Sequence, residues 1–193
     1  MAQNTYNIGN TTAYRYYRLN ITADNGATQV AVAELGLWSD TGHTIPNGRY
    51  VVVSRKSNKV MEASGGGTAN GTAFDQWGYQ GGTNQKWDFV DQGNGQYKIT
   101  GVASGRVMDV SGGSTSDGAR IQLWDWVNGN NQVNGNNQKW AVIPAGDGSF
   151  KLTAVHSGKV ADVSGGSTAD GVQVIQWTYQ KGDNQEWRFS PVQ

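Results

Sequence analysis

Short runs of alternating apolar and polar residues, separated by glycine-rich turns, recur along most of the chain. Between residues 93 and 144 this alternation predicts four strands of about five residues each. The turns between them are rich in Ser, Ala and Gly, which supply positions that tolerate a positive φ. The expected strands are Gln96–Thr100, Arg106–Val110, Arg120–Trp124 and Lys139–Ile143.

The same pattern occurs three times, so an internal repeat organises the sequence. Each repeat closes on Asn-Gln-X-Trp, at Trp87, Trp140 and Trp187. The second repeat holds a tandem duplication of VNGNNQ, Val127–Gln132 followed by Val133–Gln138, which lengthens one loop. A unit this small cannot bury its apolar face alone, so the three must share one core. Four strands in each of three copies predict an all-β fold with twelve strands closed around a threefold axis, a β-trefoil.

The triplicated Asn-Gln-X-Trp, the upstream Asp-Val and the intervening Gln-X-Trp resemble the ricin-type β-trefoil lectin family. That family includes the family-thirteen carbohydrate-binding modules of many bacterial glycoside hydrolases. The resemblance covers roughly residues 43–193, with repeats at about 43–92, 93–144 and 145–193. Many members carry a disulfide in each repeat, whereas this chain has no cysteine. Apolar cross-strand contacts are expected at those positions instead: Val60 with Tyr79, Val107 with Trp126, and Val160 with Tyr179.

The first 42 residues follow a different pattern. Two strands, Tyr14–Thr22 and Gln29–Trp38, are expected to form a hairpin through Asp24-Asn25-Gly26. This stretch resembles the last hairpin of a discoidin-like, coagulation-factor-type β-sandwich. Because an isolated hairpin is marginal in water, it either packs onto the trefoil or is the remnant of a neighbouring domain.

Composition and charge exclude several fold and function classes. With 28 glycines and eight tryptophans the chain does not suit an all-helical fold. Fifteen basic and fifteen acidic residues cancel, so no nucleic-acid partner is expected. No apolar run is long enough for membrane insertion, and the lack of cysteine excludes thiolate catalysis and cysteine-bound metals. No cofactor is expected. The polar N-terminus does not read as a signal peptide, but a removed signal would leave the same start, so export stays open.

A sugar site needs a carboxylate for neighbouring hydroxyls, an aromatic ring for the apolar face of the pyranose, and amides that fix its orientation. The resemblance assigns such a set to every repeat. Glu62 and Asp75 in the first repeat depart from the usual Asp and Gln, and Ile175 in the third stands where the family often has a polar residue. The candidates are Glu62, Asp75, Trp77, Asn84 and Gln85 in the first repeat, Asp109, Gln122, Trp124, Asn137 and Gln138 in the second, and Asp162, Trp177, Asn184 and Gln185 in the third.

Each candidate also has a structural interpretation. The Asp and Asn side chains could cap turns, and the Gln of Asn-Gln-X-Trp is more suited to a structural role than the Asn. The closing tryptophans of the three repeats are expected in the core. Strand alternation, with Phe74, Ile121 or Val174 facing inward, turns Trp77, Trp124 and Trp177 outward as platforms for a sugar, whereas Tyr79, Trp126 and Tyr179 are expected to pack.

An enzyme is disfavoured because catalysis needs unlike groups that converge once, whereas here similar groups recur three times. His156 reads as a turn residue, and His43 lies between the two expected domains. Neither HExxH, GxSxG nor a P-loop occurs. Asp117 and Asp170 lie in glycine-rich loops that could suggest calcium, but turn chemistry is the better interpretation because each loop offers too few carboxylates.

The sequence therefore predicts a non-catalytic carbohydrate-binding module that binds polysaccharide, galactose-containing or xylan-like, at more than one site. The resemblance implies a secreted bacterial protein whose partner is an attached glycoside hydrolase domain. Two alternatives remain: a free-standing galactoside-binding lectin, and a trefoil that binds only protein.

Overall fold

Twelve β-strands make up the described part of the chain, as the repeat predicts. The computed structural model describes residues 45–127 and 133–192. Residue contacts separate two units, Met1–Thr41 and Gly42–Gln193. The predicted N-terminal hairpin, His43 and residues 128–132 of the duplicated loop lie outside the described residues. The strands are β1 (Gly48–Ser54), β2 (Val60–Ala63), β3 (Phe74–Trp77), β4 (Trp87–Asp91), β5 (Gln96–Gly101), β6 (Val107–Val110), β7 (Ile121–Trp124), β8 (Trp140–Gly146), β9 (Ser149–Ala154), β10 (Val160–Val163), β11 (Val172–Trp177) and β12 (Trp187–Pro191).

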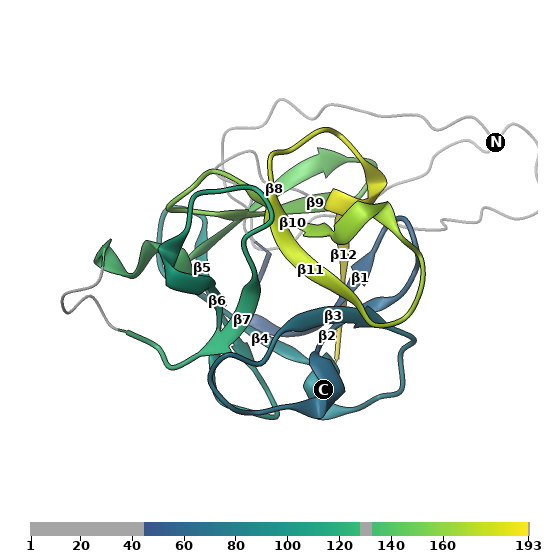
Figure 1. Cartoon of the computed structure of the whole chain (residues 1–193), viewed down its shortest axis with the longest axis horizontal. Coiled ribbons are helices and arrows are strands. Elements are labelled where there is room, and N and C mark those ends of the chain that lie inside the picture. Colours follow the sequence, from purple (N-terminus) through teal and green to yellow (C-terminus); the bar gives the residue numbers. More distant parts are fainter. Residues whose placement is uncertain (1–44, 128–132, 193) are drawn as a thin grey trace, which may run out of the picture. The chain divides into compact units, whose positions relative to one another are not determined.

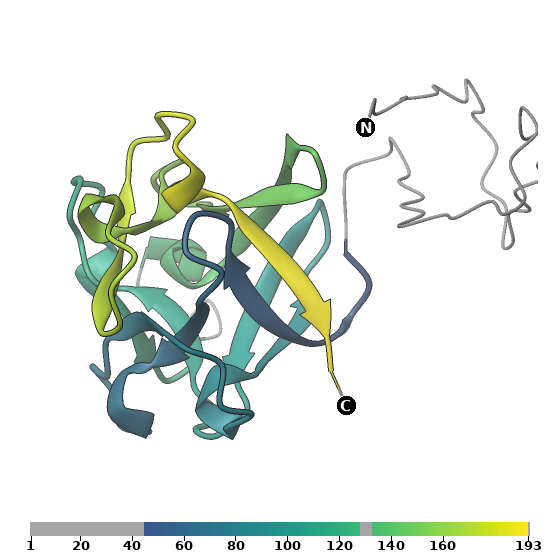
Figure 2. The ribbon, with the colours of Figure 1, turned by 90° about the vertical axis from the view of Figure 1, so that its right-hand side faces the viewer.

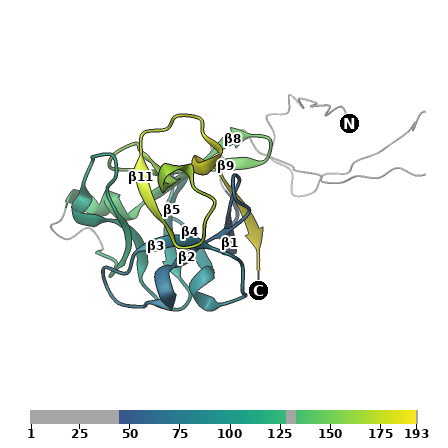
Figure 3. The ribbon, with the colours of Figure 1, turned by 45° about the vertical axis from the view of Figure 1, so that its right-hand side comes forward.

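Six of these strands close into a barrel. The antiparallel pairs β1–β4, β4–β5, β5–β8, β8–β9, β9–β12 and β12–β1 form a complete cycle. Figure 2 shows the last of these pairings, with the yellow β12 beside the dark blue β1, and Figure 3 shows the β8–β9 hairpin on the same side of the barrel. Because the cycle is closed, none of the six strands is left with an open edge along its whole length.

The other six strands form three hairpins, β2–β3, β6–β7 and β10–β11, one in each repeat. They appear as three lobes around the centre of Figure 1. The second strands of these hairpins, β3, β7 and β11, contact one another there. A closed six-stranded barrel covered by three such hairpins is a β-trefoil, so the predicted fold is confirmed.

The core is built from the tryptophans that close the repeats. Trp87, Trp140 and Trp187 are at most 1% exposed. Their indole nitrogens donate to backbone carbonyls of β2, β6 and β10, at 3.1, 3.0 and 3.0 Å. Each ring therefore joins the end of its repeat to that repeat's hairpin while its N–H stays satisfied in the interior. The predicted core role is confirmed.

The repeats are joined to one another by backbone hydrogen bonds. Gly71 of the first repeat donates to Leu123 of the second, and Gly118 of the second donates to Gln176 of the third. Gly171 of the third then donates to Gln76 of the first, which closes the circle. Every repeat thus presents one loop to the next in the same direction.

The strand register pairs the three valines of the expected apolar contacts with other aromatic residues. Val60, Val107 and Val160 are buried, but their partners in the strand register are Trp77, Trp124 and Trp177. Tyr79 is 52% exposed, so the packing role predicted for it is wrong. Its position follows the end of β3, where the alternation of the strand no longer fixes which side a side chain faces.

Among the remaining two aromatics, Trp126 is half-buried and its ring lies under the ammonium of Lys98. Tyr179 is half-buried, donates its hydroxyl to Glu186 at 2.8 Å and lies under Lys151. These contacts are with charged groups on the loop and neighbouring strands, and they stabilise the loops that follow β7 and β11.

Candidate functional site

A tight Ser-Gly-Gly turn shapes the start of each candidate site. It follows directly on the strand that carries the acidic residue, as Ser164–Gly166 follows β10. Its middle residue has a φ of 60 to 62° in all three repeats, at Gly65, Gly112 and Gly165. Glycine adopts this conformation at the lowest cost, so the repeated Ser-Gly-Gly sets where the chain leaves the strand.

Strand register then brings the predicted residues together. Glu62 lies opposite Asp75, Asp109 opposite Gln122, and Asp162 opposite Ile175. Trp77, Trp124 and Trp177 each come two residues after the second-strand residue of their repeat, so each ring shares the face of the carboxylate. The acidic residue and the ring therefore lie on one face of the hairpin in every repeat.

The three outward tryptophans are available to a ligand. Trp77 and Trp124 are 38% and 39% exposed, and Trp177 is half-buried. In the first and third repeats the ring lies over a glycine of the neighbouring repeat, Trp77 at Gly171 and Trp177 at Gly118. The prediction that these rings face outward is confirmed, and their contact with a sugar stays a prediction.

Asparagine amides orient the carboxylates in the second and third repeats. Asn137 donates to Asp109 Oδ2 at 2.8 Å, and Asn184 donates to Asp162 Oδ2 at 3.1 Å. Both amides also reach the carbonyl of the residue after the aspartate. In the second repeat Gln122 donates to the other carboxylate oxygen of Asp109 at 3.1 Å. The carboxylates are thus held in one orientation before any ligand arrives.

The glutamines of Asn-Gln-X-Trp hold the loop beside the site. The side-chain oxygen of each glutamine accepts from a backbone N–H of the loop. Its side-chain nitrogen donates to the backbone carbonyl of the residue two positions before that N–H. Their side chains are at most 2% exposed. A direct contact with a ligand would require breaking these bonds, so the arrangement gives them a positioning role. These residues are Gln85, Gln138 and Gln185.

The first repeat differs in having two opposed carboxylates. Glu62 accepts from Gln85 at 2.7 Å, and the longer side chain lets it reach this amide. Asp75 is 5% exposed, and its Oδ1 has no hydrogen-bond partner among the described residues. Burial raises the pKa of Glu62 and the charge of Asp75 adds to the effect, while burial also raises the pKa of Asp75.

Burial also raises the pKa of Asp109 and Asp162. Hydrogen bonds from the neighbouring amides oppose this rise at both aspartates. A partly dehydrated carboxylate fixed by amides is a strong acceptor for hydroxyl groups because it has little water to lose. The arrangement can therefore accept hydrogen bonds from a polyhydroxylated ligand.

Comparison with known families identifies the chain. The model of the family described as ricin-type beta-trefoil lectin domain-like matches residues 34–124 and 136–193. The chain belongs to this family. The ricin B-like lectin fold supports carbohydrate binding, and the family is in general non-catalytic.

Solved structures agree with this assignment. The designed threefold-symmetric protein ThreeFoil is 42% identical, with a TM-score of 0.71 over 76% of this chain and 100% of its own. An exo-beta-1,3-galactanase from Clostridium thermocellum is 36% identical, with a TM-score of 0.68 over 78% of this chain. This match spans only 31% of the galactanase. The Macrolepiota procera ricin B-like lectin, solved with lactose, is 22% identical with a TM-score of 0.64 over 77% of this chain and 99% of its own, and shows the shared fold.

A search of curated proteins finds no match to this chain. Within residues 45–127 and 133–192 no helix is long and apolar enough to cross a membrane.

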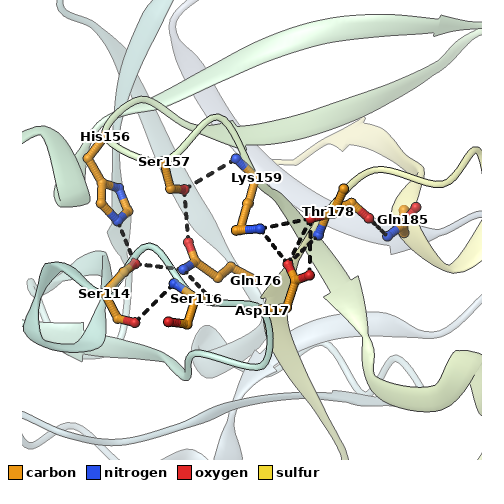
Figure 4. A network of polar contacts seen from close by, with 9 residues as sticks. All are labelled: Ser114, Ser116, Asp117, His156, Ser157, Lys159, Gln176, Thr178 and Gln185. Carbon is orange, nitrogen blue, oxygen red and sulfur yellow. Dashed lines mark hydrogen bonds and ion pairs between the residues drawn. The ribbon is translucent and has the colours of Figure 1, made fainter.

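The two glycine-rich loops of this ricin-type trefoil place their aspartates between repeats. Asp117 accepts from Lys159 and from the backbone of Thr178, both at 2.7 Å (Figure 4). Asp170 accepts from Lys59 and from the backbone N–H of Gly78. These contacts, with the positive partners, lower the pKa of both carboxyls. In the described residues no cluster of three or more metal-ligating side chains is present. The two aspartates instead join neighbouring repeats through hydrogen bonds and ion pairs.

Sequence reasoning missed that the sites of the second and third repeats each receive a side chain from the next repeat. His156 lies in a turn, as predicted, but its Nε2 reaches Ser114 O of the second repeat at 2.9 Å (Figure 4). The position that corresponds to it in the first repeat is Lys56, which extends to Gly166 of the third. The only sequence signal is that this one turn position differs in every repeat, as Lys56, Ala103 and His156.

Proposed function

We propose that the protein is a non-catalytic carbohydrate-binding module that binds polysaccharide at more than one site and targets an attached glycoside hydrolase. One observation carries the proposal: a carboxylate and an outward tryptophan recur on one face of each hairpin, and in the second and third repeats an asparagine amide from the following turn binds that carboxylate. Asp162, Asn184 and Trp177 form this set in the third repeat. The set matches what a pyranose requires, hydroxyl groups on the carboxylate and an apolar face on the ring.

Repetition supports binding to a polymer. A single shallow site reaches a Kd of about 1 mM, roughly −4 kcal/mol. Sites on separate lobes of one rigid body gain through effective concentration when one chain carries many copies of the sugar. Galactose-containing and xylan-like polysaccharides are the proposed targets.

The galactanase comparison supports attachment to an enzyme. The matched region is 36% identical and makes up only 31% of a chain that carries a glycan-degrading activity. A secreted bacterial protein with a hydrolase domain is the corresponding proposal for this chain. The repeated, similar sites support the view that this domain itself does not catalyse a reaction.

Affinity electrophoresis through gels that contain galactan, arabinogalactan, xylan or β-glucan tests the proposal. Wild-type protein should be retarded by at least one polymer. Asp162→Ala and Trp177→Ala should reduce that retardation, because they remove the acceptor and the ring of one site. Asp88→Ala is the matched control, because Asp88 pairs with Arg49 on the barrel and should leave the retardation unchanged.

Three outcomes would replace the proposal. No retardation in any gel would remove the polysaccharide function and favour a trefoil that binds protein. Agglutination of cells without retention by polymer would favour a free-standing lectin. Hydrolysis of any polymer by the purified chain would show that the repeated sites are not purely for binding.

A further inference from the structure

Each candidate site has a wall that comes from the following repeat. The wall is the turn between that repeat's first two strands, which meets the loop of the preceding repeat through a backbone bond. Arg55 donates to Glu186 O at 2.9 Å, Val102 to Lys86 O at 3.0 Å, and Val155 to Lys139 O at 3.0 Å. The residue after each of these donors therefore lies at the edge of a neighbouring site.

Lys56 occupies this position at the site of the third repeat. Its ammonium nitrogen lies 2.7 Å from the point that a Cβ would take on Gly166, and the Asn184 amide carbon lies 3.6 Å from the same point. The Lys56 side chain is exposed, and among the described residues it has no hydrogen bond or salt-bridge partner. The Lys56 ammonium and the amide that orients Asp162 thus both lie against Gly166.

The charge of Lys56 reaches the carboxylate of this site. Although burial raises the pKa of Asp162, Lys56 is among the groups that oppose the rise. Opposite Asp162 stands the apolar Ile175, so no cross-strand amide competes for the carboxylate. Asp162 and Lys56 therefore provide one anionic and one cationic group at one site.

The other two sites have no lysine at this position. At the first site the equivalent residue is Ala103, and a Cβ on Gly66 would meet nothing within 4 Å. That site instead holds the two carboxylates of Glu62 and Asp75. At the second site the equivalent residue is His156, whose Nε2 lies 2.9 Å from the Ser114 carbonyl oxygen. Burial raises the pKa of Asp109, and the imidazole of His156 is among the groups that oppose the rise, so this site has a weaker, titratable cation where the third has a lysine. The three sites are therefore similar in their carboxylate and ring, and different in the charge at their edge.

The geometry points to different ligand preferences at the three sites: the third-repeat site prefers an anionic sugar, which is a uronate or a sulfated sugar. Lys56 of the first repeat is the residue that determines this specificity. This inference rests on the proposed carbohydrate binding. The hydroxyl groups bind Asp162 and Asn184, the ring of Trp177 covers the apolar face, and the carboxylate or sulfate lies against Lys56. The first site disfavours the same ligand, because its two carboxylates repel it.

The expected size of the preference for an anionic sugar follows from the solvent exposure of Lys56. An exposed lysine paired with one anion changes affinity by about two- to five-fold. Salt screens such a pair, so the preference should be largest at about 10 mM salt and shrink above 0.15 M. The neutral counterpart of the sugar should show no such dependence on salt.

Two-dimensional NMR of the tryptophan indole groups measures the sites separately. Spectra of Trp77→Phe, Trp124→Phe and Trp177→Phe variants assign the three reporter signals among the eight tryptophans. Methyl galactoside, methyl galacturonoside and galactose 6-sulfate are then titrated into the full chain at low salt. The Trp177 signal should shift at a two- to five-fold lower concentration of one of the anionic sugars than of the neutral sugar.

Variants decide whether Lys56 is responsible. Lys56→Gln should remove the preference at Trp177 and leave binding of methyl galactoside within two-fold. Lys56→Arg should keep the preference, because it keeps the charge. Lys86→Gln is the matched control, since Lys86 lies in the first repeat beside its loop and should have no effect.

The outcomes separate this inference from the proposed function. Shifts with methyl galactoside but no anionic preference, or a preference that survives in Lys56→Gln, would overturn the inference and keep carbohydrate binding. No shift of any reporter with any of the three sugars would overturn both. A carboxylate-only or a sulfate-only preference would support the inference and identify the anion.

Discussion

Replacement of Asp75 by asparagine should stabilise the protein at neutral pH. Asp75 is 5% exposed, its Oδ1 has no partner among the described residues, and it lies opposite the carboxylate of Glu62. At the same register position of the second repeat, Gln122 donates to Asp109 at 3.1 Å. Asp75→Asn removes a like charge and supplies a donor of the same size.

The expected gain follows from the cost of an unsatisfied buried group. Such a group costs about 1–3 kcal/mol, so the asparagine variant should gain about 1–2 kcal/mol in the free energy of unfolding at pH 7. For a domain of this size each kcal/mol corresponds to a rise of about 2–4 °C in Tm. Urea unfolding at pH 7 and at pH 3.5 measures the difference.

The raised pKa of Asp75 determines how the stability of the wild type changes with pH. Because burial raises the pKa of Asp75 in the folded protein, the folded state binds its proton more tightly than the unfolded state. Wild-type stability therefore falls as pH rises from the ordinary pKa of aspartate, about 3.9, through the raised value. The asparagine variant lacks this loss, so its advantage should be small at pH 3.5 and complete at pH 7.

Asp117→Asn provides the opposite control. The pKa of Asp117 is lowered, with Lys159 as the largest cause, so this carboxylate stabilises the folded state above the ordinary pKa and loses that effect as pH falls. Asp117→Asn should be less stable than wild type at pH 7 and approach it in acid. An Asp75→Asn variant that is less stable at pH 7, or equally stabilised at both pH values, would refute the account of the first site.

Three further predictions concern the core and the junction of the first and third repeats. Trp140→Phe should lower the free energy of unfolding, measured in urea, by about 2–4 kcal/mol, because it opens a cavity and loses the indole hydrogen bond. The control Trp124→Phe should change this free energy by less than about 0.5 kcal/mol, because Trp124 is 39% exposed. Glu186→Lys, which introduces the residue found in the other two repeats, should cost about 2–4 kcal/mol by calorimetry, because Glu186 is buried and bound by Arg55; equal stability would contradict this. Burial, with the hydrogen bond to Glu186, raises the pKa of Tyr179 to about 12, and ¹³C NMR titration of the tyrosine ring should show a lower value in Glu186→Gln.

Most of the fold can be predicted from the sequence repeat. Alternation within one repeat predicts β5, β6, β7 and β8, and the start of each observed strand lies within one residue of the expected one. Register then places Asp109 opposite Gln122, as a two-strand pairing of the predicted hairpin requires. These features are local, so a pattern along the chain is enough to predict them.

Features that depend on loops were harder to predict. Tyr79 was expected to pack, yet it is 52% exposed because it lies beyond the last residue of β3. The glutamines of Asn-Gln-X-Trp carried a possible role in binding, and only the structure shows that both ends of the amide are used by the loop, as for Gln185. Neither outcome follows from the period of a strand, since both depend on where an irregular segment turns.

The contribution of one repeat to the site of another could not be predicted either, and this explains how three similar units can differ in specificity. The repeats close through backbone bonds, such as Gly171 N to Gln76 O, which do not depend on the side chain at the facing turn. That turn position is therefore free to vary as Lys56, Ala103 and His156 without loss of the closed fold. Each change alters the edge of the preceding repeat's site and leaves that repeat's own carboxylate and ring in place. A threefold fold of this kind can thus diversify the ligands of its sites through residues that lie outside the repeated motif.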